Sequence, residues 1–199
     1  MPPPSGSCER EVKVVVVGPY CSGKTSLLRR YINGAFELSW STVGVDFFRI
    51  NPKRSRGRTV LVWDTAGQER FMGVTPSYLR DSNAALVVFD VSCIESWNAV
   101  PHWIGVVRQH SGADTPILVV GNKTDLEDSR AHTHSTFETG ALSQGCGYLE
   151  ASAKTGAGVN RVFDSIAAVG DEIRDQEQAK EIDLVLRDAR ERRPYACCQ

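Results

Sequence analysis

The chain has 199 residues, of which 41% are hydrophobic, and its formal net charge is −1. This length predicts one folded domain with tails rather than two domains. The near-neutral charge argues against a global basic field, so we expect no nucleic-acid partner. No apolar run approaches the roughly 20 residues that span a bilayer, and residues 1–10 lack the pattern of a secretory signal. We therefore expect a cytoplasmic protein.

The predicted elements alternate between strands and helices. Short runs rich in β-branched residues predict strands buried on both faces of a parallel sheet, and two runs joined by a segment with proline and glycine predict a hairpin. In chain order the predicted elements are strand 12–17, helix 24–32, hairpin strands 45–50 and 58–63, strand 84–89, helix 95–109, strand 116–120, strand 148–151 and helix 159–173. The pattern predicts an α/β fold with three layers, in which a mostly parallel six-stranded sheet has one antiparallel edge strand. A ligand should lie beyond the carboxyl ends of the strands.

The domain organisation follows from composition. Residues 1–10 are rich in proline, glycine and serine and predict a disordered tail, whereas residues 11–175 carry the predicted elements. The charge-rich residues 176–199 predict a second, variable tail. The six cysteines show no metal-ligand spacing, and a disulfide framework is not expected in a chain of this size without an export signal. We expect four free thiols, while the adjacent Cys197 and Cys198 require another explanation.

Residues 18–25 match the phosphate-loop pattern G-x-x-x-x-G-K-[ST] between a predicted strand and a predicted helix. In such a loop the backbone N–H groups converge on phosphates, Lys24 reaches the terminal phosphates, and the hydroxyl of Thr25 binds Mg²⁺. The alternative is a glycine turn with an incidental lysine, which the flanking strand and helix disfavour. The expected nucleotide contacts in this region are Tyr20, Cys21, Ser22, Gly23, Lys24, Thr25 and Ser26.

Residues 122–125, Asn-Lys-Thr-Asp, follow the predicted strand 116–120, and here the sequence resembles the superfamily of P-loop GTPases. The resemblance implies that Asn122 and Asp125 recognise the guanine edge, because the carboxylate accepts from two N–H groups that adenine lacks. The stem of Lys123 would pack on the base, beside Leu126. A polar loop after a strand is common in isolation. Its order and distance from the phosphate loop support the GTPase reading.

Further motifs extend the resemblance along the chain. Ser152, Ala153 and Lys154 resemble the third guanine-contacting loop, whose main-chain N–H groups bind the base. Phe36 matches the aromatic residue near the guanine, and Trp40 matches a residue that closes over the phosphates.

The segment 64–69 resembles the one that senses the γ-phosphate. There Asp64 would hold Mg²⁺ through water, the N–H of Gly67 would bind the γ-phosphate, and Gln68 would orient the attacking water. Thr42 resembles the threonine that contacts both Mg²⁺ and the γ-phosphate. The metal set implied is Thr25, Thr42 and Asp64, and the catalytic pair is Gln68 and Lys24.

Residues 63–71 and 43–47 resemble Rab proteins more than Ras, Rho, Arf or Ran proteins, and residues 76–82 and 120–126 resemble the Golgi-associated Rabs. The resemblance extends from residue 12 to residue 173. It implies that Phe47, Trp63 and Tyr78 form the aromatic triad that meets effectors; the alternative is three core aromatics. Cys197 and Cys198 resemble a paired-cysteine prenylation signal, and two geranylgeranyl groups would supply durable anchoring.

The resemblance also implies a cellular role. We expect a monomeric switch that binds GTP or GDP with Mg²⁺, hydrolyses GTP slowly and regulates vesicular traffic on the cytosolic face of Golgi or endosomal membranes. Its expected partners are an exchange factor, a GAP, a GDP-dissociation inhibitor, a prenylation escort protein and effectors.

Two features depart from the family pattern. Tyr20 stands where most relatives carry glycine or serine, and its ring should crowd the hydrolytic geometry. The spacing from Lys24 to Thr42 is one residue shorter than usual. This puts in question the geometry of the segment around Thr42, the first of the two segments that respond to the γ-phosphate. A GTP-locked scaffold that scarcely hydrolyses GTP is therefore an alternative, whereas a P-loop ATPase or small kinase is disfavoured by residues 122–125.

Overall fold

The computed structural model describes residues 11–37, 45–53, 59–65, 75–169, 172 and 175–176. These residues build a six-stranded sheet in the order β2-β3-β1-β4-β5-β6. The strands are β1 Val12–Val17, β2 Val45–Ile50, β3 Val60–Thr65, β4 Ala84–Asp90, β5 Ile117–Asn122 and β6 Gly147–Glu150. Only the pair formed by β2 and β3 is antiparallel among these described strands. The predicted mostly parallel sheet with one antiparallel edge strand is confirmed.

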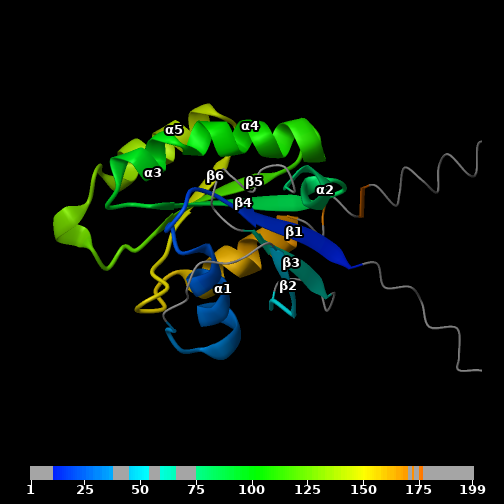
Figure 1. Ribbon diagram of the computed structural model, residues 1–199, viewed down its shortest axis with the longest axis horizontal. Coiled ribbons are helices and arrows are strands. Elements are labelled where there is room, and N and C mark those ends of the chain that lie inside the picture. The colour runs from blue at the N-terminus through cyan, green and yellow to red at the C-terminus, as the bar shows by residue number, and fades with distance from the viewer. Residues whose placement is uncertain are drawn as a thin grey trace, which may run out of the picture.

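Helices cover both faces of the sheet (Figure 1). The helices are α1 Lys24–Asn33, α2 Thr75–Leu79, α3 Ile94–Asn98, α4 Val100–Ser111 and α5 His134–Ser143, and residues 159–169 are also helical. In Figure 1, α3, α4 and α5 lie above the sheet, while α1 and the helical residues 159–169 lie below it. None of the helices in the described ranges is both long and apolar enough to span a bilayer.

Two hydrophobic clusters separated by the sheet form the core. Alternate residues of β1 serve both: Val14 and Val16 belong to the cluster beneath α1, whereas Val15 and Val17 belong to the cluster that contains Trp103 of α4. All four valines are fully or almost fully buried. Burying such a side chain contributes about 1.5 to 3 kcal/mol. Two-sided burial explains why β4 and β5, like most of β1, are continuous apolar runs rather than alternating ones.

The structure corrects several predicted boundaries. The second hairpin strand begins at Val60 rather than at residue 58, and it extends to Thr65. The single predicted helix 95–109 is two helices interrupted at Ala99, because Pro101 has no N–H with which to continue the hydrogen-bond ladder. The prediction omitted α2 and α5. In α5, threonine and glycine weaken the helical pattern, and the one clear signal is Thr133, whose side chain accepts from the N–H of Thr136.

Candidate functional site

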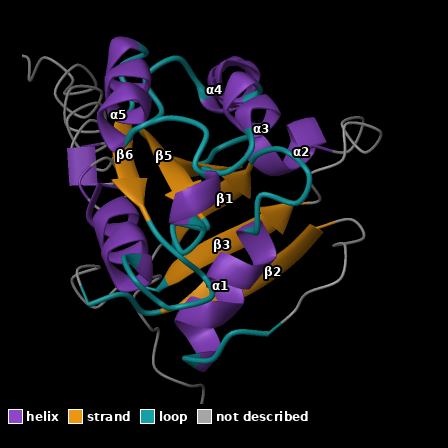
Figure 2. Ribbon diagram, turned by 90° about the vertical axis from the view of Figure 1, so that its left-hand side faces the viewer, coloured by secondary structure: helices purple, strands orange, loops and turns teal. Residues whose placement is uncertain are grey.

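The loops that follow β1, β5 and β6 meet at one edge of the sheet, where the parallel strands have their carboxyl ends (Figure 2). The first loop connects β1 to α1, the second follows Asn122 at the end of β5, and the third contains Ser152. The polar motifs predicted from the sequence occupy these three loops. Hydrogen bonds from the side chain of Asn122 to Ser22 and Ala153 join the three loops.

The loop before α1 has a backbone that only a few residues can adopt. Gly18 has φ +141°, and a Cβ at this position would lie 2.1 Å from the carbonyl oxygen of Val88 in β4. Gly23 has φ +85°, and a Cβ there would lie 2.4 Å from Nδ2 of Asn122. Both glycines are therefore required by close packing as well as by their dihedral angles. Helix α1 begins directly after Gly23 with no side chain capping its N-terminus, which is the arrangement that suits a bound phosphate.

Lys24 is folded into this loop. Its Nζ donates to the carbonyl oxygens of Gly18 at 3.0 Å and Pro19 at 2.9 Å. Only 6% of the residue is exposed. Burial lowers the pKa of Lys24 to about 8, although the nearby carboxylate of Asp64 opposes the shift. The loop thus places a buried ammonium group beside the backbone that would surround phosphates.

Thr25 and Asp64 join α1 to the end of β3. Oγ1 of Thr25 donates to Oδ2 of Asp64 at 2.5 Å, and Asp64 is fully buried. Burial raises the pKa of Asp64 to about 6, while the hydrogen bond from Thr25 and the charge of Lys24 act in the opposite direction. The other carboxylate oxygen, Oδ1, is buried without a hydrogen-bond partner among the described residues.

This oxygen pair fits Mg²⁺. The ion prefers oxygen ligands and usually takes one or two protein groups together with substrate phosphates and water. Thr25 and Asp64 supply a hydroxyl and a carboxylate with an unsatisfied oxygen beside the phosphate loop. No group of three His, Cys, Asp or Glu side chains in the described ranges could hold a metal by itself. The residues therefore match a metal that is bound jointly with a phosphorylated ligand.

Asn122 connects the phosphate loop to the other two loops. Its Nδ2 donates to the carbonyl oxygen of Ser22 at 2.9 Å, and its Oδ1 accepts from the N–H of Ala153 at 3.1 Å. The side chain is almost fully buried, with 1% of the residue exposed. A buried amide with donor and acceptor both satisfied holds its neighbours in one arrangement.

Asp125 is held by the third loop. Its Oδ1 accepts from Oγ of Ser152 at 2.6 Å, and Nζ of Lys154 lies 3.7 Å from Oδ2. The side chain of Asp125 retains 12% exposure. The carboxylate is thus oriented by protein groups and still accessible to a ligand.

Lys123 has a left-handed backbone, with φ +66°, and its Nζ lies 2.7 Å from Oδ2 of Asp90 at the end of β4. Asp90 was not among the site residues predicted from the sequence. Its signal was an acidic residue closing an otherwise apolar strand. Three further residues expected to contact the nucleotide are partly exposed: Phe36 at 39%, Leu126 at 39% and Tyr20 at 50%.

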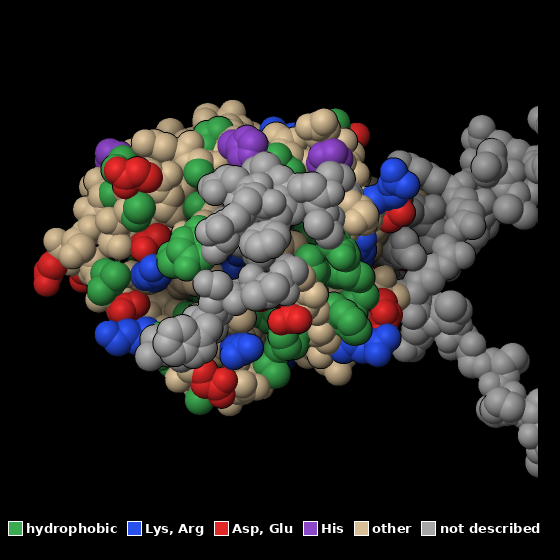
Figure 3. Space-filling view, viewed as in Figure 1, with side chains coloured by type: hydrophobic (Ala, Val, Ile, Leu, Met, Phe, Trp, Pro, Cys, Tyr) green, Lys and Arg blue, Asp and Glu red, His purple; other side chains and the backbone are tan. Residues whose placement is uncertain are grey.

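The three aromatic residues expected to meet effectors lie in a row. The ring centroids of Phe47 and Trp63 are 5.8 Å apart, and those of Trp63 and Tyr78 are 5.4 Å apart. Phe47 is 60% exposed, whereas Trp63 packs partly against the cluster beneath α4. The row is therefore a partly exposed surface on the sheet edge, and the alternative of three core aromatics is wrong for Phe47. Figure 3 shows hydrophobic side chains gathered in patches on this view of the molecule.

Several predicted site residues lie outside the described residues. They are Trp40, Thr42, Gly67, Gln68, Cys197 and Cys198. Their assigned roles remain predictions.

The comparison with protein families agrees with the site. A phosphate loop, a buried threonine and aspartate pair, and two loops carrying Asn122 and Asp125 lie together at the carboxyl ends of the strands, which is where an α/β sheet is expected to bind a nucleotide. A model of the Ras family matches residues 13–171, which is most of the chain. The chain belongs to the Ras family, the small GTPases that bind and hydrolyse GTP as molecular switches.

Proposed function

We propose that this GTPase is a Rab-type switch, which recruits effectors in its GTP-bound state and thereby regulates vesicular membrane traffic. The observation that supports it is the row of Phe47, Trp63 and Tyr78 beside the nucleotide site. Trp63 directly precedes Asp64 in β3 and is paired with Phe47 across the hairpin. A shift of Asp64 on loss of the γ-phosphate would therefore act one residue away from Trp63 and the exposed aromatic row.

The proposed chemistry is transfer of the terminal phosphoryl group to water. Lys24 stabilises the charge that develops on the phosphates, and Gln68 orients the attacking water. Thr25 and Thr42 would hold Mg²⁺ directly and Asp64 would hold it through water, and the ion would neutralise phosphate charge. The N–H of Gly67 contacts the γ-phosphate. Loss of that phosphate releases the segments that contain Thr42 and Gly67, which constitutes the signal.

Guanine selectivity is assigned to Asp125, with Asn122 and Ala153 fixing the loops around the base. Selectivity is tested by loading the purified protein separately with GTP and with ATP and following phosphate release over hours. We expect GTP to load and to be hydrolysed slowly, and ATP not to load. Equal loading of the two nucleotides would contradict the assignment of Asp125.

Membrane attachment is assigned to geranylgeranyl groups on Cys197 and Cys198, delivered with the escort protein and masked by a GDP-dissociation inhibitor. A tagged chain expressed in cells should sediment with endomembranes, and the Cys197→Ser, Cys198→Ser double variant should remain soluble. A wild-type chain that is equally soluble would remove this part of the proposal. The same fractions, probed with Golgi and endosomal markers, test the expected location.

The second candidate function is a GTP-locked scaffold that recruits effectors and scarcely hydrolyses GTP. The half-exposed ring of Tyr20 in the phosphate loop favours it. Both candidates share the nucleotide site, and they differ only in the rate of hydrolysis and in the need for a GAP. Single-turnover hydrolysis, described in the Discussion, separates them.

A further inference from the structure

Lys123 and Asp90 form an ion pair between the ends of two neighbouring strands. Asp90 is the last residue of β4 and pairs in register with Asn122, the last residue of β5, so that Lys123 emerges beside it. Nζ of Lys123 lies 2.7 Å from Oδ2 of Asp90. The two side chains are 32% and 12% exposed, and the pair is therefore partly shielded from solvent.

The carboxylate of Asp90 is fixed independently of Lys123. Its Oδ1 accepts from the N–H of Ser92 at 2.9 Å and from the hydroxyl of Ser92 at 2.7 Å. Its backbone N–H donates to Oγ of Ser96 at 2.9 Å. Burial alone would raise the pKa of Asp90, but the contacts with Lys123 and Ser92 outweigh it and lower the pKa. Asp90 is therefore an ionised acceptor whose Oδ1 is held by Ser92 and whose Oδ2 pairs with Lys123.

The stem of Lys123 runs between this acceptor and the phosphate loop. A Cβ added to Gly23 would lie 4.0 Å from Cε of Lys123, which places the stem beside the loop that precedes α1. At its other end the backbone of Lys123 has φ +66° and is followed by Thr124, whose N–H donates to the carbonyl oxygen of Ala151 at 3.3 Å. The ammonium group is thus held by Asp90 and the backbone by the third loop, and the methylene groups lie between them beside the phosphate loop.

We propose that Asp90 is a positioning residue for the guanine nucleotide, which holds the stem of Lys123 in place as a preformed apolar shelf for the base. The inference rests on the proposed nucleotide role of Lys123. A free lysine side chain loses rotamer entropy when it is immobilised. The ion pair imposes that cost during folding, so binding of the base does not incur it.

The test is the dissociation rate of a fluorescent GDP analogue from the full chain, measured by chasing with excess GDP. Asp90→Asn keeps the shape of the side chain and removes the charge. We expect dissociation to be about tenfold faster, the size of effect typical of contacting residues that couple. A rate equal to that of wild type would overturn the proposal.

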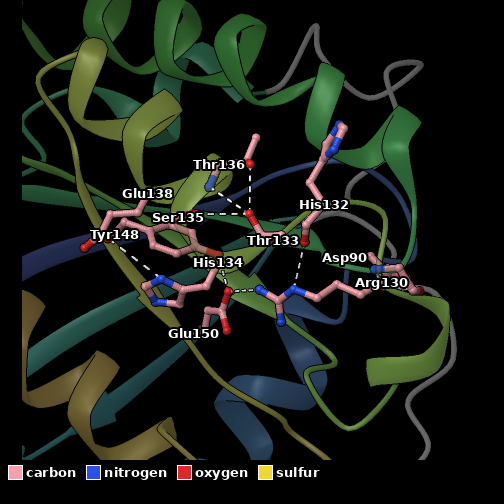
Figure 4. Close-up of polar contacts among 11 residues, drawn as sticks. Asp90, Arg130, His132, Thr133, His134, Ser135, Thr136, Glu138, Tyr148 and Glu150 are labelled. Atoms are coloured by element: carbon pink, nitrogen blue, oxygen red, sulfur yellow. Dashed lines mark hydrogen bonds and ion pairs between the residues drawn. The ribbon is translucent and has the colours of Figure 1, made fainter.

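Glu150→Gln is the matched control. Glu150 forms an ion pair with Arg130 in which both side chains are also partly buried, at 18% and 19% exposure. Figure 4 shows this pair, together with the hydrogen bond from Arg130 to the backbone of His132 and the bond from Tyr148 to Glu150. Loss of this carboxylate should leave the GDP dissociation rate within about twofold of wild type, since measured effects below that size correspond to less than RT. A tenfold acceleration in this variant as well would mean that any lost ion pair loosens the site.

A double-mutant cycle separates positioning from a general structural role. In a Lys123→Ala background, Asp90→Asn should have no further effect on GDP dissociation, because the shelf is already absent. An equal acceleration in both backgrounds would show that Asp90 acts through the fold and would overturn the proposal. Should Asp90→Asn fail to fold, Ser92→Ala loosens the same carboxylate and should give a smaller acceleration that also vanishes in the Lys123→Ala background. A wild-type chain that binds no guanine nucleotide would instead refute the proposed function on which the inference rests.

Discussion

At the scale of single residues, Lys24 and Asp64 are opposite charges buried under one loop. Burial moves the pKa of Lys24 down to about 8 and that of Asp64 up to about 6. Each shift favours the neutral form, and each group opposes the shift of the other. The site therefore holds two charges at a cost to folding, which is the arrangement expected where a phosphate and a cation are to be bound.

Tyr20 is the residue through which this chain departs most clearly from the family pattern. Its ring is 50% exposed in the phosphate loop. We expect Tyr20→Gly to increase the single-turnover rate of GTP hydrolysis by about tenfold, because removing the ring frees space for Gln68 and water to reach the productive geometry. Phosphate release from GTP-loaded protein measures the rate. Tyr20→Phe keeps the ring and should behave as wild type, and a Tyr20→Gly rate no faster than wild type would disprove the crowding.

Gly18 allows a test of the close contact between the phosphate loop and β4. Gly18→Ala would bring a Cβ to 2.1 Å from the carbonyl oxygen of Val88, and we expect it to lower the free energy of unfolding by about 3 to 4 kcal/mol. Gly34→Ala is the control, since Gly34 also has a positive φ, +69°, but nothing lies within 4 Å of the added Cβ. That control should lose only the strain of about 1 to 2 kcal/mol. Urea denaturation measures both, and equal losses would mean that the contact has no effect.

Some residues of the site could be predicted from the sequence and others could not. Lys24, Asn122 and Asp125 were predictable, because each belongs to a short motif whose spacing carries the chemistry. Asp90 was not, because its partner Lys123 is 33 positions away and becomes a neighbour only when β4 and β5 pair in register. The sequence pattern within each strand contains no information on how β4 and β5 pair.

At the scale of elements, α4 illustrates how helix positions differ in their tolerance of change. Gly105 lies on the exposed side of α4, with nothing within 4 Å of an added Cβ. We expect Gly105→Ala to raise the free energy of unfolding by about 0.5 to 1 kcal/mol, because alanine has the higher helix propensity and restricts the unfolded chain. Thermal or urea denaturation measures the gain.

The contrasting substitution is Gly140→Ala in α5. A Cβ at Gly140 would lie 2.6 Å from Cζ2 of Trp97, so this change should destabilise the protein in spite of the same gain in propensity. A gain at Gly140 equal to that at Gly105 would mean that Trp97 moves aside freely.

Elements were predictable where strand-forming residues follow one another in the sequence. β1 and β2 were predicted with the bounds that the structure shows, since each has a clear run of strand-forming residues. α5 was missed because Phe137 and Ala141 are the two buried residues in its ten, too few to produce a helical period. The interruption at Ala99 depended on one missing hydrogen-bond donor, at Pro101.

At the scale of the whole molecule, a nucleotide that binds three loops should stabilise the entire fold. A ligand at 100 times its dissociation constant adds about 2.7 kcal/mol to the free energy of unfolding. For a domain of this size we expect GDP with Mg²⁺ to raise the melting temperature by about 8 °C. ADP at the same concentration should change it by less than about 1 °C, since adenine lacks the two donors for Asp125. Differential scanning fluorimetry measures both shifts, and an equal effect of ADP would contradict guanine selectivity.

The fold class was predictable from alternating strands and helices together with the family resemblance. The order of strands in the sheet was not, because β1 lies between β3 and β4, and neither neighbour follows it directly along the chain. Such an order is decided by which helix covers which face, a property of the assembled layers.

β3 separates an aromatic ring and a buried carboxylate between the two sides of the sheet. Val62 and Trp63 belong to opposite sides of the sheet, and Asp64, next along the strand, bonds with Thr25 of α1. Successive side chains of a strand face opposite ways, so the ring of Trp63 and the carboxylate of Asp64 share a backbone but not a surface. We therefore predict that substitutions at Phe47 or Trp63 change the proposed effector surface and leave the chemistry on the other side unchanged. The product of a duplicated gene could acquire a new partner in this way and keep its rate of GTP hydrolysis.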